Sequence, residues 1–251
     1  MLLENKTAVI YGGAGAIGSA VARAFAREGA RVHLAGRTRS KLDTVAEEIR
    51  SAGGTAETAE VDALDGRAVD EYADAVAAEA GGIDISFNLI SVNDVQGTPL
   101  VEMDLEDFMA PIDTAVRSTF LTARAAARHM ILQGSGVILN FGGEGPPMRD
   151  YSIGGFQIAL HAVEAMRRQL SSELGRHGVR VVTLRTGGVP EGIPQDFKAR
   201  DSIVKMLEDA TLLGRTATLE DVGNVAAFVA SDKARTMTAA TVNVSAGALI
   251  D

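Results

Sequence analysis

Residues 7–18 read Thr7-Ala8-Val9-Ile10-Tyr11-Gly12-Gly13-Ala14-Gly15-Ala16-Ile17-Gly18. The run before Gly12 is apolar and partly β-branched, as in a strand that is buried on both faces. The glycines permit a tight turn and the close approach of a bulky group, and the run 19–26 is predicted to be helical. The start of such a helix offers unpaired N–H groups and a positive dipole end. The stretch therefore predicts a strand, a turn and a helix that together bind the pyrophosphate of a dinucleotide.

The spacing of these glycines departs from the strict dinucleotide pattern, because Ala16 stands two positions before Gly18. An ordinary tight turn is therefore the alternative interpretation. The position of the turn between a strand and a helix, with a second strand expected at 31–37, favours phosphate binding. The residues expected to contact the cofactor here are Gly12, Ala14, Gly15, Ala16, Ile17 and Gly18.

The composition indicates a globular α/β protein. Of the 251 residues, 46% are hydrophobic and 23% are charged, which is enough for one large domain over residues 1–251. There is no cysteine, which excludes disulfides, thiolate metal sites and a cysteine nucleophile. The net charge of −9 argues against nucleic acid or an acidic membrane surface as a partner.

Neither a metal site nor a membrane segment is expected. The four histidines are not paired with carboxylates at ligand spacing. The longest uncharged stretch, 8–22, is interrupted by glycines and is shorter than a membrane span. The run 1–6 is too short and too charged for a signal peptide. We therefore expect a cytoplasmic protein.

Strand and helix signals alternate along the chain, which predicts a Rossmann-type doubly wound parallel sheet with helices on both faces. Strands are expected at 7–11, 31–37, 55–61, 83–88, 136–141, 179–184 and 241–244. Helices are expected at 19–26, at 40–52 with Ser40 as its cap, and at 66–80, 105–133, 155–176 and 219–230. Mixed helical signals over 191–214 predict a mobile flap.

Ligands of open α/β sheets bind beyond the carboxyl ends of the strands, and Arg37 stands at the end of the second of these strands. An acidic residue there would bind the ribose hydroxyls of NAD, whereas this chain has Gly36 and then Arg37. A guanidinium suits a 2′-phosphate, because it forms charge-assisted and often bidentate hydrogen bonds. NADP(H) is therefore favoured over NAD(H), with a solvated basic helix start as the alternative.

The other strand ends supply the rest of the expected cofactor site. Asp62 fits an adenine-side contact, although a turn or helix cap is an equally simple interpretation. The remaining residues expected to contact the cofactor at these ends are Ala63, Asn88, Leu89, Ile90, Gly188 and Val189.

Motifs in the same order and spacing make the chain resemble the short-chain dehydrogenase/reductase family over essentially its full length. The matching segments are 12–18, 35–37, 61–62, 83–85 with Asn88, 120–125, 136–140, 170–174, 178–181, 213–215 and 228–232. The resemblance implies a Rossmann subunit and a nicotinamide dinucleotide. It also implies an Asn-Ser-Tyr-Lys set, in which tyrosine exchanges the substrate proton and lysine lowers the pKa of that tyrosine.

The chain departs from this set at every position. Alignment without gaps places Phe156 at the tyrosine and Leu160 at the lysine. The serine position is Gly143 and the asparagine position is Ala115. A rival alignment, which needs an insertion, places Tyr151 at the tyrosine and Gly155 at the lysine. Neither alignment places a lysine at the lysine position.

A reduction needs a proton as well as a hydride, so three interpretations follow. The first is an oxidoreductase whose proton donor lies at another position, or whose conjugated substrate needs little help from an acid. Tyr151 is the best candidate for such a donor, and Glu144, Asp150 and His161 are weaker ones. The second is a non-redox enzyme such as a cyclase or isomerase, and the third is a non-catalytic dinucleotide-binding or scaffold subunit. The replaced positions make the floor of the expected pocket apolar, which favours a small-molecule ligand with an apolar or planar face.

The chain is expected to form a homo-oligomer. The predicted helices 105–133 and 155–176 carry small residues that permit close helix packing, namely Ala115, Ser118, Ala123, Ala125, Ala126 and Ala127. Packing on the chain's own sheet is the alternative use of those residues. The family resemblance implies pairing of these helices between subunits, in a tetramer or else a dimer, and the apolar end 241–251 is a further candidate contact.

Overall fold

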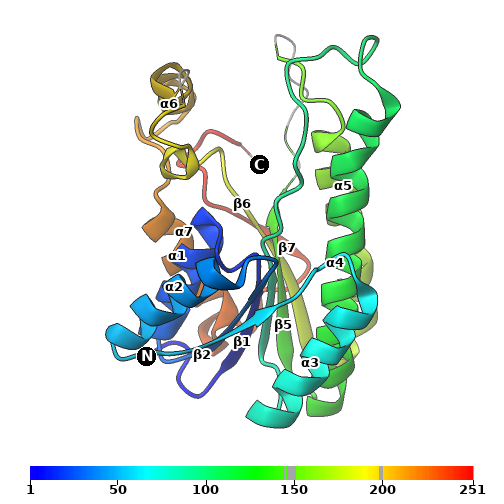
Figure 1. Ribbon diagram of the computed structural model, residues 1–251, viewed down its shortest axis with the longest axis vertical. Helices are drawn as coiled ribbons and strands as arrows, with labels where there is room; N and C mark the ends of the chain where they lie inside the picture. The colour runs from blue at the N-terminus through cyan, green and yellow to red at the C-terminus, as the bar shows by residue number, and fades with distance from the viewer. Residues whose placement is uncertain (144, 146–150, 198–199, 251) are drawn as a thin grey trace.

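Seven parallel strands form the centre of the protein, in the order β3-β2-β1-β4-β5-β6-β7 (Figure 1). The computed structural model describes residues 1–143, 145, 151–197 and 200–250. The strands are β1 (Thr7–Tyr11), β2 (Arg31–Gly36), β3 (Thr55–Glu60), β4 (Ile85–Asn88), β5 (Gly136–Gly142), β6 (Val179–Arg185) and β7 (Ala240–Asn243). The chain order reverses between β1 and β4, which makes that point the switch of a doubly wound sheet.

Helices cover both faces of this sheet, and each face has its own apolar core. One face carries α1 (Ala16–Arg27), α2 (Arg39–Ser51) and α7 (Leu219–Ala230). The other carries α3 (Gly66–Ala80), α4 (Leu105–Gln133) and α5 (Phe156–Leu174). Short 3₁₀ turns lie at Gly175–His177, Pro190–Gly192 and Asp232–Ala234. The predicted fold class is confirmed.

Polar caps and glycines set the ends of several helices. The Asp65 carboxylate accepts hydrogen bonds from two N–H groups at the start of α3. Thr218 and Asp221 form a reciprocal capping box at the start of α7. Gly81 and Gly134 adopt the left-handed conformation at the ends of α3 and α4. The predicted ranges 66–80, 105–133 and 219–230 agree with these helices because such signals are local.

Two predicted helix starts were wrong, one by three residues and one by a single residue. Helix α1 begins at Ala16 rather than at residue 19, because the tail of the glycine turn is already helical and Gly15 caps it without a side chain. Helix α2 begins at Arg39, and its N-cap is Thr38, whose side chain makes no capping hydrogen bond. Ser40 therefore lies in the first turn and is not the predicted cap.

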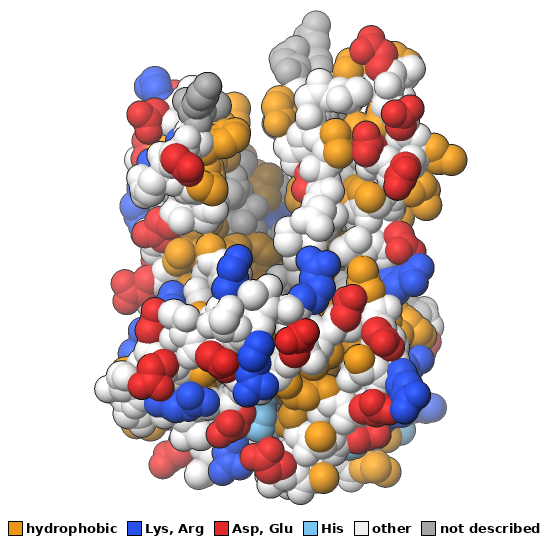
Figure 2. All heavy atoms as spheres, in the orientation of Figure 1, with side chains coloured by type: hydrophobic (Ala, Val, Ile, Leu, Met, Phe, Trp, Pro, Cys, Tyr) orange, Lys and Arg blue, Asp and Glu red, His pale blue; other side chains and the backbone are white. Residues whose placement is uncertain are grey.

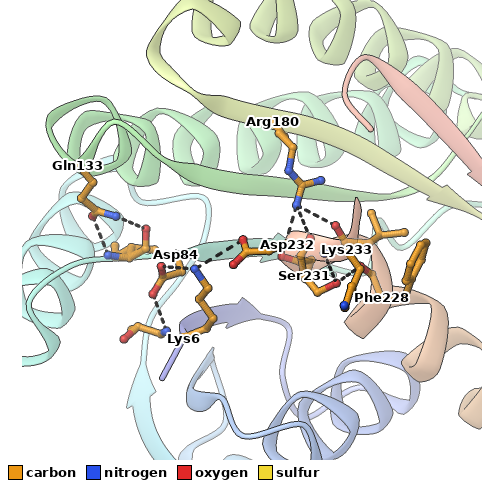
Figure 3. A network of polar contacts seen from close by, with 12 residues as sticks. Lys6, Asp84, Gln133, Arg180, Phe228, Ser231, Asp232 and Lys233 are labelled. Atoms are coloured by element: carbon orange, nitrogen blue, oxygen red, sulfur yellow. Dashed lines mark hydrogen bonds and ion pairs between the residues drawn. The ribbon is translucent and has the colours of Figure 1, made fainter. Parts of the chain in front are cut away.

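A polar network lies at the amino ends of the strands, on the edge of the sheet away from the predicted ligand loops (Figure 3). The Gln133 side chain accepts from the Ile83 N–H at 2.9 Å and donates to the Ile83 carbonyl at 3.0 Å. Both backbone groups of Ile83 are thus used outside the sheet, so β4 begins at Ile85 and not at the predicted Ile83. Lys6 bridges Asp84 and Asp232, and Arg180 donates to carbonyls at the end of α7.

In the described residues of the segment 191–214, helix α6 (Arg200–Asp209) lies beyond the carboxyl end of β6 (Figure 1). The Glu191 carboxylate accepts a hydrogen bond from the Leu219 N–H and so links the base of this segment to the start of α7. The mixed helical signals are explained by α6, while the mobility of the segment stays a prediction.

Candidate functional site

The glycine turn joins β1 to α1 with very little space to spare. The N–H of Gly12 donates to the Ala35 carbonyl at 2.9 Å, which ties the turn to β2. Gly12 has φ +77°, and a Cβ there would lie 2.3 Å from the Leu89 carbonyl oxygen. A Cβ on Gly18 would lie 2.2 Å from the Gly12 carbonyl oxygen. The turn therefore requires glycine at both positions, and it leaves the start of α1 free of side-chain caps and acidic residues.

A cleft of about 370 Å³ opens beside this turn, at the carboxyl ends of β1 to β4. It lies where the sheet order reverses, which is the usual ligand position in such folds. Its lining includes many of the residues predicted from the sequence: Gly12, Ala14, Gly15, Arg37, Asp62, Ala63, Leu89 and Ile90. Residues from four separate strand ends, up to eighty positions apart in the sequence, thus meet in one cleft.

Two cations in the cleft wall have no partner in the described part of the chain. Arg37 and Lys41 both line the cleft and are exposed, and neither side chain makes a hydrogen bond or ion pair with another described residue. Arg39 differs, because its Nε bonds the Asp43 carboxylate at 3.0 Å. Unpaired donors beside Gly36 leave this corner of the cleft suited to an anion.

Asp62 serves the turn as well as the cleft. One oxygen of its carboxylate accepts the Leu64 N–H at 3.0 Å, and its carbonyl accepts the Asp65 N–H at 3.0 Å. The side chain is exposed and lines the cleft. The two interpretations considered for Asp62 are therefore compatible, since the second carboxylate oxygen can still face a ligand.

Asn88 supports the cleft from behind and does not line it. Its amide group donates to Ser118 at 3.0 Å and to Thr119 at 3.1 Å, and its oxygen accepts the Ile90 N–H at 3.1 Å. These bonds fix the end of β4 against α4 and shape the loop that carries Leu89 and Ile90. These bonds give the Asn88 side chain a positioning role, and its direct contact with the cofactor stays a prediction.

Other predicted contacts lie near the cleft but outside its wall. Ala16, Ile17 and Gly18 belong to the first turn of α1. Gly188 has φ +119° and packs against Leu207 of α6, while Val189 packs on the core below α1. A Cβ on Gly192 would lie 3.8 Å from Ala16. The segment after β6 therefore returns to the start of α1.

The cleft is also lined by Gly36, Ser91 and Asn93, which lie in strand-end loops where the ligand was expected. Its lining further includes residues that were not predicted: Thr38, Lys41, Leu42, Val61, Leu64 and Thr114. Thr114 lies on α4, one turn before Ser118, which bonds Asn88. That spacing places both on one face of the helix, and this is the signal that could have revealed Thr114.

The four positions of the expected catalytic set lie around the ends of β5 and α5. Leu160 is buried and packs on Gly142, where a Cβ would lie 2.7 Å from its side chain. Ala115 belongs to an apolar cluster with Ala159 and Val163. Phe156 is the first residue of α5 and is half-buried. Gly143 is the fourth position, and none of the four residues has a side chain that can donate a proton.

Tyr151 lies on the segment before α5 and its side chain is 48% exposed. Within the described part of the chain its hydroxyl makes no hydrogen bond. The Gly155 of the rival alignment is buried against α4, where a Cβ would lie 2.0 Å from the Phe108 carbonyl oxygen. His161 is exposed on α5, and Glu144 and Asp150 lie outside the described residues.

Within the ranges that the structure describes, no helix has the length and apolar character that a membrane crossing needs. Among those same residues, no group of three or more His, Cys, Asp or Glu side chains stands together as metal ligands would.

Comparison with known proteins defines the class. A family model described as enoyl-(acyl carrier protein) reductase matches residues 12–248. The chain belongs to the short-chain dehydrogenase/reductase family of oxidoreductases. Proteins of this family bind nicotinamide dinucleotides.

Several relatives align with nearly the whole chain. The 3alpha-hydroxysteroid dehydrogenase of Mediterraneibacter gnavus is 31% identical and covers 99% of this chain and 98% of its own. The secoisolariciresinol dehydrogenase of Forsythia intermedia is 31% identical over 93% of this chain and 85% of its own. A short-chain type dehydrogenase/reductase from Mycobacterium marinum superimposes with a TM-score of 0.85 at 29% identity, covering 98% of this chain and 96% of its own.

Proposed function

We propose that the protein is an NADP(H)-dependent oxidoreductase with a non-standard reaction site. One observation carries the cofactor part of the proposal: the cleft joins an uncapped glycine turn to two unpaired cations, Arg37 and Lys41. The turn suits a pyrophosphate because helix N–H groups and the helix dipole attract anions. The cations suit a 2′-phosphate, and NAD(H) has no group that would use them.

Each part of the cofactor has residues that would hold it. The turn from Gly12 to Gly18 would hold the pyrophosphate, and Asp62 with Ala63 would face the adenine side. The remaining expected contacts are Leu89 and Ile90 beyond β4, and Gly188 with Val189 beyond β6. When bound, NADPH supplies a hydride. The chain's own residues must then orient the substrate and supply or relay a proton.

The apolar floor determines which substrates suit the site. Phe156 and Leu160, at the positions of the expected tyrosine and lysine, cannot donate a proton and would offer apolar contact to a planar or apolar small molecule. A conjugated acceptor fits such a floor, since its negative charge is delocalised and needs less acid assistance. For a simple carbonyl substrate, the relocated donor would be the exposed hydroxyl of Tyr151.

Calorimetric titration with NADPH and with NADH tests the proposal. We expect saturable NADPH binding that Arg37→Ala weakens by about 10-fold, the effect of losing a charge-assisted hydrogen bond. NADH binding should not change with this substitution. Arg39→Ala is the matched control, because Arg39 lies two positions away but is paired with Asp43. Absence of binding of either nucleotide would contradict the redox function and favour a cofactor-free enzyme or a scaffold.

We also infer a homo-oligomer, a tetramer or else a dimer, in the cytoplasm. The small residues of α4 that were candidates for subunit packing are buried within the chain itself. The exposed apolar residues are different ones: Phe120 is 49% exposed and Leu132 is 87% exposed on α4, and Ile158 is 45% exposed on α5. Sedimentation analysis of Phe120→Asp tests this surface, and an unchanged mass would exclude it.

A further inference from the structure

Helix α6 lies at the surface and has little packing of its own. None of its residues is buried. Its Leu207 packs on Gly188, where a Cβ would lie 2.9 Å from both methyl carbons of that leucine. Between described residues, the Leu213 N–H makes the one backbone hydrogen bond that links 194–214 to a distant part of the chain, and its acceptor is the Ala246 carbonyl at 3.2 Å. The position of α6 therefore depends on what its flanking residues contact.

Residues 245–249 form a compact turn after β7, called the 245–249 turn from here on. The Ser245 carbonyl accepts the Ala248 N–H at 3.0 Å, and the Ser245 hydroxyl accepts the Leu249 N–H at 3.1 Å. The Asn243 amide group of β7 donates to the Leu249 carbonyl at 2.7 Å. These bonds hold the turn from within and from β7, so its shape does not depend on α6.

The 245–249 turn is also attached to the strands beside it. Arg185 is the last residue of β6, and its carbonyl accepts the Val244 N–H at 2.7 Å, just before the turn. The stem of the Arg185 side chain packs in turn over Gly143, where a Cβ would lie 2.7 to 2.8 Å from its Cβ, Cγ and Cδ atoms. A Cβ on Gly187 would lie 2.5 Å from the Cβ of Ala248. The turn is therefore fixed to the carboxyl edge of the sheet.

The outer side of the 245–249 turn touches the segment that follows α6. A Cβ on Gly247 would lie 2.6 Å from the Cβ of Leu212 and 2.8 Å from its Cγ, so the Leu212 side chain lies directly over Gly247. Figure 1 shows the end of the chain, marked C, running beside the segment that follows α6. With the hydrogen bond from Leu213 to Ala246, two neighbouring residues join this segment to the turn.

Helix α6 borders a hollow in the molecule. Figure 2 shows a deep hollow between the side that carries α6 and the side that carries α5. The two ends of the segment that carries α6 are joined at its base, because the Glu191 carboxylate accepts the Leu219 N–H. The segment is thus closed at its base and tied to the 245–249 turn beyond α6, so the turn determines how far α6 stands from α5.

We propose that the 245–249 turn is a latch that holds α6 in place and so sets the width of the hollow. A helix without buried residues opens at a low cost in free energy, so a single contact such as that of Leu212 with Gly247 decides its position. Release of this contact lets α6 move while the nucleotide cleft keeps its shape. The proposal does not rest on the proposed function, because the lining of that cleft includes neither Leu212 nor the turn.

Fluorine NMR of the full chain tests the latch. The chain has no cysteine, so Met206→Cys on α6 gives a single thiol for a trifluoromethyl label. We expect one resonance from this labelled protein. Gly247→Ala brings a Cβ into collision with Leu212 and should shift or split that resonance. Gly214→Ala is the matched control: both glycines have positive φ, +87° and +66°, but nothing lies within 4 Å of a Cβ on Gly214.

A second pair of variants removes the contact without straining the backbone. Leu212 and Leu213 are both exposed, so the fold should tolerate a serine at either position. Leu212→Ser removes the side chain over Gly247 and should change the resonance, whereas Leu213→Ser keeps the N–H that bonds Ala246 and should leave it unchanged. The proposal is overturned if Leu212→Ser leaves the resonance of the labelled protein unchanged, or if either control changes it as much as its partner variant does.

NADPH titration of the same variants separates this proposal from the proposed function. NADPH affinity should be equal in all of them, because the cleft lies apart from the 245–249 turn. Absence of NADPH binding to the unsubstituted protein would count against the proposed function alone, since the fluorine resonance is measured without a nucleotide.

Discussion

Removal of the buried carboxylate of Glu164 should destabilise the protein strongly. Its Oε2 atom accepts from the Nε of Arg167 at 3.0 Å, from the Nη2 at 2.9 Å and from the Thr241 hydroxyl at 2.9 Å. The side chains of Glu164 and Arg167 are 1% and 5% exposed. Glu164→Ala would leave a buried guanidinium without its counter-charge, which costs about 3–5 kcal/mol in the free energy of unfolding.

Urea unfolding followed by circular dichroism, at matched protein concentration, measures this cost. The double variant Glu164→Leu with Arg167→Met should recover most of the lost stability, because an apolar pair of similar volume needs no counter-charge. Asp113→Ala is the control, since its ion pair with Arg117 is exposed and is worth under about 1 kcal/mol. A loss below about 1 kcal/mol for Glu164→Ala would refute the reasoning.

The same pair predicts a pH dependence. Burial raises the pKa of Glu164, but the hydrogen bonds and charge of Arg167, with the Thr241 hydroxyl, outweigh it and hold the pKa below its usual value. The stabilisation is therefore present above the pKa of the unfolded carboxyl and is lost as pH falls through the folded value. The urea midpoint of Glu164→Gln should vary less with pH in this acidic range than that of the parent protein.

Three further outcomes are expected. Burial lowers the pKa of the His33 imidazole despite the nearby Glu79. The contribution of neutral His33 to the free energy of unfolding is therefore complete above the pKa of the unfolded state, and it decreases as the pH falls from that value toward the pKa of the folded state. The urea midpoint of His33→Leu should vary less with pH over that range. Gly18→Ala should cost about 1–3 kcal/mol through overpacking against the Gly12 carbonyl, measured against Gly36→Ala, where the nearest atoms lie at 3.6 Å. Tyr151→Phe should lower kcat for a ketone substrate and leave its KM unchanged; unchanged turnover would exclude Tyr151 as the donor.

The fold was predictable because its signals are local and repeated. The buried run 7–11, the cap at Asp65 and the glycine at 134 each specify an element without knowledge of the rest of the chain. The element boundaries that were predicted wrongly include one that depends on a contact with a residue far away in the sequence. The start of β4 depends on the Gln133 side chain, which takes the backbone groups of Ile83 from fifty residues away.

The site was predictable to the extent that it follows the strand ends. Arg37 and Asp62 line the cleft because they lie one and two residues beyond the ends of β2 and β3. The direction of a side chain is not determined by this rule, so Asn88 points inward to Ser118 although it ends β4. The contact between Arg185 and Gly143 was not predictable, because it appears only when β5 and β6 are paired.

The contact between Arg185 and Gly143 restricts the order in which the site can be altered. A hydroxyl cannot be introduced by Gly143→Ser alone, since its Cβ would collide with the arginine stem. Arg185→Ala made first would remove the contacts with Cγ and Cδ and leave the one with Cβ at 2.8 Å, so the serine would face a smaller collision together with the cost of its φ of +84°. The two substitutions are therefore epistatic, and a laboratory evolution experiment that seeks a serine here should recover changes at Arg185 earlier than changes at Gly143.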